Sequence, residues 1–365
     1  MARRLACSLL FLFVVSVLGC NTTKVAPPAA ASADSATFDP DGTAHITRVI
    51  PMPATVSPEA QTWLASLNKS TPGPEDLATR RKRTDEWRAK QSAAALELFP
   101  VVVKPTTIAG VQTDILTPFA PVHLSRLPEP FDPSKERILI NLHGGGFNSD
   151  SGSIIEGAPI CNLAKIKVVS VYYRLAPENP FPAPVDDVVA VYKELLKTYK
   201  PRHIGIFGTS AGAILTAEVA VKLKQLGLPL PGALGLFSVL TDYSRPSDSH
   251  ELFTLNGFPG SLQPQDPHNR IGEEYARDTD RKNPVLSPLY ADLKGMPPTL
   301  LVTSTRDLLL SDTAIFHRAL LRANVDSQLV VFEALPHAFW YHFQLPETTE
   351  ALHLMANFFN KKLSH

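Results

Sequence analysis

Cysteine is scarce in this chain, with Cys7, Cys20 and Cys161 the only three among 365 residues. Cys7 and Cys20 fall in an N-terminal segment that we expect to be processed, so Cys161 has no partner for an internal disulfide. The stability of the folded protein must therefore come from its buried core. Cys161 lies in an apolar segment, and we expect it on a buried helix face with a structural role.

The sequence also lacks an excess of charge of either sign. It contains 35 basic and 35 acidic residues and no basic stripe, which argues against nucleic acid as a partner. No H-E-x-x-H pattern and no cysteine cluster are present, so we expect no metal. A hydrophobic content of 44% over this length is enough for one large domain with a sizeable core.

The amino terminus has the features of an export signal. Arg3 and Arg4 precede the apolar stretch 5–18, which is shorter than the ~20 residues that a membrane-spanning helix needs. The following Leu18-Gly19-Cys20 resembles the lipobox of bacterial lipoproteins. That resemblance implies a signal peptide over 1–20 and a lipid on Cys20, which would anchor the exported protein to a membrane. Asn21, where Asp would favour the inner membrane, points to the outer membrane; an ordinary signal peptide cleaved near Gly19 is the alternative.

Beyond the signal, the composition changes twice. Residues 21–45 are rich in Ala, Pro, Ser, Thr and Asp, which is typical of a flexible tether, and a domain over 46–365 follows. Helices expected after Ser57 and over 75–98 precede the first strand of the main sheet, and the polar, proline-rich stretch 241–290 interrupts the later pattern. We expect 46–100 and 241–290 to form a cap over the carboxyl edge of the sheet.

The rest of the domain alternates short apolar runs with helical segments. This order predicts an α/β fold with a mostly parallel central sheet and helices on both of its faces. The expected strands are 111–117, 137–142, 167–172, 204–207, 233–239, 300–303 and 328–332, and the expected helices are 155–165, 184–199, 211–226, 312–323 and 347–361.

Residues 208–212 read Gly-Thr-Ser-Ala-Gly, a G-x-S-x-G pattern between an expected strand and an expected helix. A serine on such a sharp turn is lifted clear of the sheet as a nucleophile, and the small glycines allow strand and helix to pack closely. Ser210 is therefore the candidate nucleophile. A second glycine-rich segment, 143–146, follows another strand, where bare backbone N–H groups could bind an oxyanion. This segment lacks the G-x-G-x-x-G spacing of a dinucleotide site, so we expect no cofactor.

A serine nucleophile needs a histidine base that is oriented by a carboxylate. Asp307 and His337 come after Ser210 in the chain order serine, acid, histidine, and each follows the end of an expected strand. Asp312 opens the next helix and is more simply a cap. The other histidines lie before the serine, inside helices, in the insertion or further from a strand end. The sequence therefore predicts a triad of Ser210, Asp307 and His337.

These segments together resemble the bacterial hormone-sensitive-lipase-like family of α/β-hydrolase esterases. The matching parts are 143–146, 173–178, 208–212 and 287–289, with Asp307 and 337–339. The resemblance implies an α/β-hydrolase fold with a helical cap, and it implies hydrolysis of carboxylic esters, usually with short acyl chains. It assigns the oxyanion hole to the N–H groups of Gly145, Gly146 and Ala211. Many family members have Asp before the nucleophile, whereas this chain has Thr209.

The expected function is that of a serine carboxylesterase that cleaves short- to medium-chain acyl esters of small molecules through an acyl-enzyme intermediate. Two alternatives remain open. The protein could be an acetyl-esterase or lactonase that uses the same triad, or a non-catalytic surface-binding protein with a hydrolase fold. Phe147, Phe339 and Trp340 fit either an apolar acyl pocket or ordinary core packing. The sequence does not decide the oligomeric state and is compatible with a homodimer.

Overall fold

The computed structural model describes residues 34–67, 75–119, 136–150, 152–258 and 272–363. The chain divides into two units, Met1–Met52 and Pro53–His365. In the first unit, β1 (Ser35–Phe38) and β2 (Ala44–Thr47) pair as an exposed antiparallel hairpin, so the predicted tether 21–45 includes most of a hairpin. The predicted signal peptide and Cys20 lie outside the described residues.

The second unit contains an eight-stranded sheet with the order β10-β9-β8-β7-β5-β6-β4-β3. β3 and β4 are antiparallel to their neighbours, and the remaining strands run parallel, which confirms the predicted mostly parallel sheet. The strands are β3 (Val101–Ile108), β4 (Val111–Pro118), β5 (Ile138–Leu142), β6 (Lys167–Val171), β7 (Ile204–Thr209), β8 (Ala233–Phe237), β9 (Thr299–Ser304) and β10 (Ser327–Phe332).

The seven predicted strands of this sheet are present, and β3 is the strand that the sequence analysis did not predict. It forms a hairpin with β4 through a two-residue turn, in which Ala109 and Gly110 both have positive φ angles, as a type I′ turn requires. Pro105 interrupts the strand signal in the sequence. It is tolerated because β3 is an edge strand, where a missing N–H on the outer side breaks no ladder bond.

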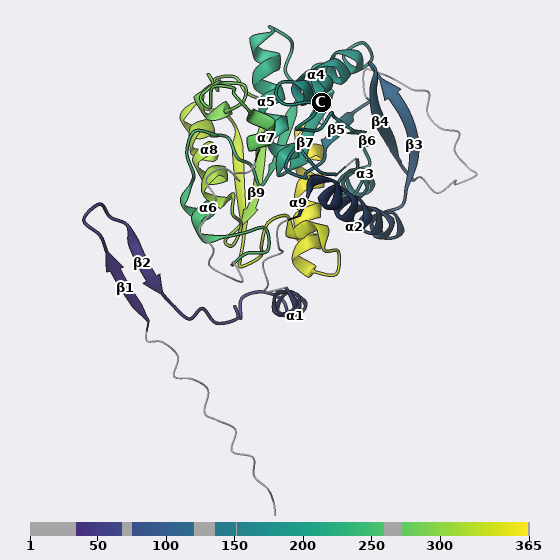
Figure 1. Cartoon of the computed structure of the whole chain (residues 1–365). Coiled ribbons are helices and arrows are strands. Elements are labelled where there is room, and N and C mark those ends of the chain that lie inside the picture. The colour runs from purple at the N-terminus through teal and green to yellow at the C-terminus, as the bar shows by residue number, and fades with distance from the viewer. Residues whose placement is uncertain (1–33, 68–74, 120–135, 151, 259–271, 364–365) are drawn as a thin grey trace, which may run out of the picture. The chain divides into compact units, whose positions relative to one another are not determined.

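Helices cover both faces of the sheet, and the buried core accordingly forms two clusters. α4, α5 and α8 contribute to one cluster, and α1, α3 and α9 contribute to the other (Figure 1). The helices of this unit are α1 (Pro58–Ser66), α2 (Leu77–Leu98), α3 (Gly157–Ala164), α4 (Ala183–Leu195), α5 (Ala211–Gln225), α6 (Asp248–Leu252), α7 (Glu273–Ala276), α8 (Leu310–Arg322) and α9 (Pro346–Lys362).

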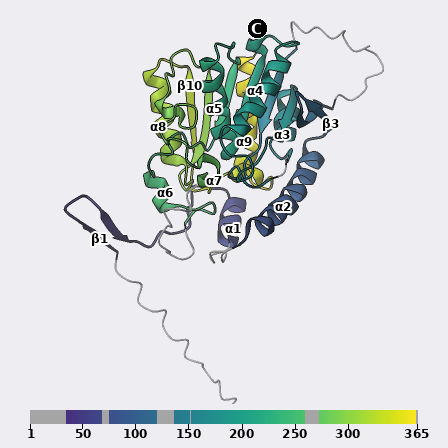
Figure 2. The same ribbon diagram turned by 45° about the horizontal axis from the view of Figure 1, so that its top comes forward.

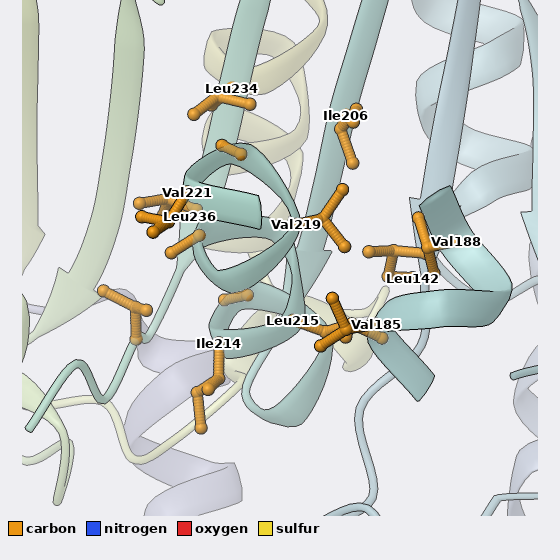
Figure 3. Close-up of a cluster of buried hydrophobic side chains, with 14 of the residues drawn as sticks. Leu142, Val185, Val188, Ile206, Ile214, Leu215, Val219, Val221, Leu234 and Leu236 are labelled. Carbon is orange, nitrogen blue, oxygen red and sulfur yellow. The ribbon is translucent and has the colours of Figure 1, made fainter. Parts of the chain in front are cut away.

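The central helix α5 shows how the parallel strands and helices hold one another. Figure 3 shows Val219 of α5 beside Ile206 of β7 and Val221 of α5 beside Leu236 of β8, with Ile214 nearer the amino-terminal end of the helix. All five side chains are buried, and burying each one contributes roughly 1.5–3 kcal/mol of hydrophobic stabilisation. This packing fixes the amino-terminal end of α5 at the carboxyl end of β7.

The predicted cap region contains α1 and α2 before the sheet, and α6 and α7 in the insertion. Figure 2 shows these four helices at the lower end of the sheet, toward which the parallel strands point. Ser57 is the N-cap of α1, because its Oγ accepts a hydrogen bond from the N–H of Ala60, and Pro58 is the first residue of the helix. The N–H and Oγ of Ser57 also donate to Glu347 of α9, which fixes α1 to the body of the domain.

Parts of the predicted cap, 68–74 and 259–271, lie outside the described residues. Within the described part of the chain, no helix is both long enough and apolar enough to cross a bilayer.

Candidate active site

Ser210 lies directly between β7 and α5, as the G-x-S-x-G pattern predicts. Its backbone has φ 58° and ψ −122°, a conformation that is costly for a residue with a side chain. The N–H of Ser210 donates to the carbonyl oxygen of Phe237 at the end of β8, at 2.9 Å. The neighbouring strand therefore helps to hold the strained turn.

The two glycines of the pattern are required by close backbone contacts. A Cβ at Gly208 would lie 2.3 Å from the carbonyl oxygen of Leu142, and a Cβ at Gly212 would lie 1.8 Å from the same atom. Both distances are far below van der Waals contact with a backbone atom that cannot move aside. The sequence interpretation of these glycines as packing residues is therefore confirmed, with the end of β5 as the contacting segment.

Asp307 and His337 form a direct hydrogen bond. Asp307 follows β9, His337 follows β10, and His337 Nδ1 lies 2.8 Å from Asp307 Oδ1. Both side chains are almost completely buried. The structure thus brings together the predicted acid and the predicted base, although 30 residues separate them in the chain.

The Asp307 carboxylate accepts hydrogen bonds at both oxygens. The hydroxyls of Ser238 and Thr303 donate to Oδ2, and the N–H of Leu309 donates to Oδ1 at 2.9 Å. Burial by itself raises the pKa of Asp307, but the interaction with His337 and these donors outweigh it and hold the pKa below its ordinary value. An ionised Asp307 requires His337 Nδ1 to carry a proton, so Nε2 is left as the basic nitrogen.

Hydrogen bonds made by neighbouring residues connect the Asp307–His337 pair to the turn of Ser210. Phe237, which accepts from the N–H of Ser210, is followed by Ser238, which donates to Asp307. On the other side, Trp340 Nε1 donates to Thr209 Oγ1 at 2.9 Å, and Trp340 is three residues after His337. The turn of Ser210 and the segment of His337 are therefore held against each other from two directions.

The glycine-rich segment after β5 lies beside the same turn. A Cβ on Gly144 would be 3.5 Å from the Cβ of Ser210. Gly145 and Gly146 have φ angles of 110° and 63°, and a Cβ on Gly145 would come within 2.4 Å of the carbonyl oxygen of Ser149. These glycines therefore permit a turn that other residues cannot form, and their amides follow a strand that adjoins β7.

None of the N–H groups of Gly145, Gly146 and Ala211 donates a hydrogen bond to another described residue. Ala211 is the first residue of α5, where the helix itself provides no acceptor for the N–H and the helix dipole favours negative charge. These three amides have the chemistry of oxyanion donors.

A layer of aromatic contacts supports the glycine-rich turn. The ring of Tyr173 stacks on His143 with 4.2 Å between centroids, and the Tyr173 hydroxyl donates to the carbonyl oxygen of His143 at 2.6 Å. Tyr173 begins the segment 173–178, for which the sequence analysis expects a structural role near the site. The observed contacts are structural in this sense, because they hold His143, the residue that directly precedes the glycines.

Helix α2, which belongs to the predicted cap region, also contacts this turn. The Arg81 guanidinium donates to the carbonyl oxygens of Asn148 and Ala176 at 2.7 and 2.8 Å, and it pairs with Glu178 through two bonds of 2.7 Å. One cationic side chain therefore joins α2 to the loops that follow β5 and β6. Sequence reasoning missed Arg81, because nothing distinguishes it from the other charges of the helix.

Two other histidines lie near the site, and the structure gives each of them a packing role. His143 is buried, and burial lowers its pKa; its Nδ1 is 2.8 Å from the carbonyl oxygen of Gly144. His342 is packed against Trp63 of α1, and burial lowers its pKa to about 4. Neither side chain contacts Asp307, so His337 remains the candidate base.

The aromatic residues that could have lined an acyl pocket are core residues. Phe147, Phe339 and Trp340 are at most 2% exposed, and Phe147 stacks on Tyr275 with 3.7 Å between ring centroids. Cys161 is also buried, on the α3 face that the sequence predicts, with Sγ 3.4 Å from the carbonyl oxygen of Leu116. Among the described residues, no group of three or more His, Cys, Asp or Glu side chains is placed to hold a metal.

Sequence reasoning also missed the donors to Asp307. Ser238 follows β8 directly and has a φ angle of 57°, and Thr303 is the penultimate residue of β9. Ser238 follows β8, which pairs with β7, and Thr303 is near the end of β9, which pairs with β8. This position was a usable signal, because the carboxyl ends of neighbouring parallel strands meet at one edge.

Comparisons with known proteins agree with this geometry. Residues 139–341 match the family described as alpha/beta hydrolase fold. An acetyl-hydrolase of Streptomyces hygroscopicus is 33% identical over 61% of this chain and 75% of that protein. An esterase of Acinetobacter venetianus is 28% identical over 72% of this chain and 84% of that protein.

Solved structures show the same likeness over most of the chain. The crystal structure of esterase E25 has a TM-score of 0.72 and 30% identity, covering 87% of this chain and 97% of that one. An esterase from the bacterial hormone-sensitive lipase family has a TM-score of 0.67 and 27% identity, covering 84% of this chain and 99% of that one. The strand order, the serine turn and these matches together show that the chain belongs to the α/β-hydrolase fold family and is similar to the bacterial hormone-sensitive-lipase-like esterases within it.

Proposed function

We propose that the protein is a serine carboxylesterase that hydrolyses short- to medium-chain acyl esters of small molecules through an acyl-enzyme intermediate. The observation that carries this proposal is the Asp307–His337 hydrogen bond at 2.8 Å, held beside the strained turn of Ser210. The names of the similar proteins, esterase and acetyl-hydrolase, support ester hydrolysis.

The mechanism follows from the protonation states of the site. His337 Nε2 takes the proton of Ser210 as Oγ attacks the ester carbonyl, and Asp307 stabilises the imidazolium that forms. The N–H groups of Gly145, Gly146 and Ala211 bind the oxyanion of the tetrahedral intermediate. His337 then protonates the departing alcohol, and afterwards it activates the water that releases the acid.

The direct test is Ser210→Ala with p-nitrophenyl acetate as substrate. This change removes the nucleophile and leaves the strained backbone in place, so we expect hydrolysis to fall to background in a folded protein. A fluorescent phosphonate should label the wild type and should not label the variant. Substantial hydrolysis by purified Ser210→Ala protein would refute the assignment, and an unlabelled, inactive wild type would favour a binding protein.

A second candidate is deacetylation of a larger substrate, which the acetyl-hydrolase relative favours. A series of p-nitrophenyl esters from C2 to C12, assayed beside acetylated sugars, separates the two. A preference in kcat/KM for acyl chains of about four to six carbons supports the carboxylesterase, whereas activity confined to acetyl groups supports the deacetylase.

We further propose that residues 1–20 direct export and that Cys20 carries a lipid, which holds the enzyme at a bacterial membrane. The support is the Leu18-Gly19-Cys20 pattern after a basic start and an apolar stretch. Cys20→Ser should abolish incorporation of radiolabelled palmitate and should move the protein from the membrane fraction to the soluble fraction. Unchanged labelling in the variant would exclude Cys20 as the lipid site.

A further inference from the structure

A buried polar cluster lies behind the Ser210 turn, on the face of the sheet that carries α3 and α9. Its centre is Glu156, which immediately precedes α3 and is 3% exposed. Glu156, Thr209, Trp340 and Tyr341 line one small internal space together with apolar residues of α3 and α9. The mechanism proposed above uses none of these polar side chains.

Glu156 is bonded to segments that are distant in sequence. The Tyr341 hydroxyl donates to Glu156 Oε1, and Asn141 Nδ2 of β5 donates to Oε2 at 3.3 Å. Thr209 Oγ1 accepts from Trp340 Nε1 at 2.9 Å, so its own proton is left to interact with Glu156. Thr209 precedes the nucleophile by one residue, whereas Tyr341 follows the candidate base by four.

The charges around Glu156 come from several elements. Arg88 of α2 lies with its guanidinium carbon 4.4 Å from the centroid of the Tyr341 ring, and its Nε is 3.1 Å from Asp150 Oδ2. Burial raises the pKa of Glu156 to about 7, with Asp150 adding to the rise and Tyr341, Arg88 and Thr209 opposing it. Burial also raises the pKa values of Tyr341 and of nearby Tyr173 well above ordinary, so both phenols stay neutral.

We propose that Glu156 is a positioning residue for the hydrolysis proposed above, and that its ionised carboxylate holds Thr209 and Tyr341 together and thereby sets the nucleophile against the base. The inference rests on the proposed function. A carboxylate is an acceptor at both oxygens and can serve every donor that faces it. When it is protonated, one oxygen becomes a donor, and one of the three facing donors loses its acceptor.

The first experiment compares Glu156→Gln with wild type by measuring kcat for p-nitrophenyl acetate as a function of pH. The amide fills the same space but behaves like the protonated acid at every pH. We expect kcat of the variant to be about tenfold lower at about pH 8.5, with KM unchanged because Glu156 does not touch substrate. The ratio of wild-type to variant kcat should approach one at about pH 5.5, where the wild type is also protonated.

This ratio is the deciding quantity because any pH effect that is the same in both proteins cancels from it. A merely structural role for Glu156 would give a ratio that does not change with pH, and that result would overturn the proposal. Glu218→Gln is the matched control. Glu218 is a buried carboxyl of α5 that accepts from Tyr275 at 2.5 Å on the opposite face of the sheet. We expect its kcat to stay within about twofold of wild type at every pH.

The second readout does not depend on catalysis. The three tryptophans of the chain give three indole N–H resonances in an NMR spectrum of the Ser210→Ala protein, and Trp340→Phe assigns one of them. The Trp340 resonance should titrate with a midpoint near pH 7, and this titration should disappear in Glu156→Gln. If Glu156→Gln does not fold, Tyr341→Phe replaces it. Loss of that hydroxyl removes an interaction that lowers the pKa of Glu156, so the midpoint should move upward.

The two readouts separate the inference from the proposed function. Hydrolysis that survives in Ser210→Ala refutes the nucleophile, and the Trp340 titration still reports on the contacts of Glu156. If the Trp340 resonance titrates identically in the proteins with and without the Glu156→Gln change, the inference is overturned, whatever the activity of the wild type.

Discussion

Asp312 offers a test of the structure that does not depend on activity. It lies in the first turn of α8, is 3% exposed, and its Oδ2 accepts from the Ser247 hydroxyl at 2.5 Å. Burial raises its pKa from 3.8 to about 7, with the neighbouring Asp242 and Asp307 carboxylates adding to the rise and the Ser247 bond opposing it. The sequence analysis treats Asp312 as a helix cap, whereas the structure buries it.

The size of the effect follows from this rise in pKa. One pKa unit corresponds to ~1.36 kcal/mol, so a rise to about 7 is equivalent to about 4 kcal/mol of unfolding free energy. The folded state holds the proton more tightly than the unfolded state does. The contribution is therefore fully present below about pH 4 and is lost as the pH rises through about 7.

We expect Asp312→Asn to remove this part of the pH dependence, because an amide does not titrate. Between pH 5 and pH 8, the unfolding free energy of the wild type should fall by about 3 kcal/mol more than that of the variant, because about two pKa units separate pH 5 from the folded-state value of about 7. With an unfolding entropy of about 2.1 cal/mol/K per residue, this difference corresponds to a shift in Tm of about 4 °C.

The assay is urea or thermal unfolding of both proteins across this pH range, followed by circular dichroism. Asp186→Asn is the matched control, because Asp186 occupies the first turn of α4 but is exposed to solvent. The control should follow the wild type at each pH. If wild type and Asp312→Asn lose stability in parallel between pH 5 and pH 8, then Asp312 is hydrated in the folded protein and the reasoning fails.

Three further predictions concern the site and its supports. Gly212→Ala should destabilise the fold by roughly 3 kcal/mol in urea unfolding, because its Cβ would lie 1.8 Å from a carbonyl oxygen of β5; a change below 0.5 kcal/mol would contradict the contact. Asp307→Asn should lower kcat by about 10⁴-fold without unfolding the protein, since the amide favours the wrong imidazole tautomer, and a loss below tenfold would exclude Asp307 as the acid. Arg81→Met should speed hydrogen exchange in α2, because it removes the hydrogen bonds to Glu178 and to two backbone carbonyls. The control Arg83→Met breaks only an ion pair with Glu75 near the start of the helix, so it should leave hydrogen exchange beyond position 88 unchanged.

The fold was largely predictable because its signals are local. Buried parallel strands read as short apolar runs, and the alternation with helices already predicts the layered sheet. The turn at Ser210 was predictable for the same reason, because the two glycines mark a position at which no other residue fits. β3 escaped prediction because Pro105 and Lys104 weaken its pattern, and its place at the sheet edge, which tolerates them, is a property of the tertiary structure.

The site was only partly predictable. Chain order and strand ends pointed to Asp307 and His337, whose hydrogen bond the structure contains. The residue types of Ser238, Thr303 and Glu156 carry no signal, because a serine, a threonine or a glutamate is common anywhere in a sequence. The position of Ser238 and Thr303 at strand ends places them near the site, but only the folded structure shows that their hydroxyls donate to Asp307.

The sequence by itself determined which segments become strands and helices, and which serine sits on the sharp turn, because these choices depend on neighbours along the chain. Only the tertiary structure decided the protonation of the acidic groups. Asp307 and Asp312 are five residues apart and both buried, yet the pKa of one is lowered and that of the other is raised. The difference comes from what folding places around each carboxyl: a histidine and several hydrogen-bond donors around Asp307, and one hydroxyl with two other carboxylates nearby around Asp312.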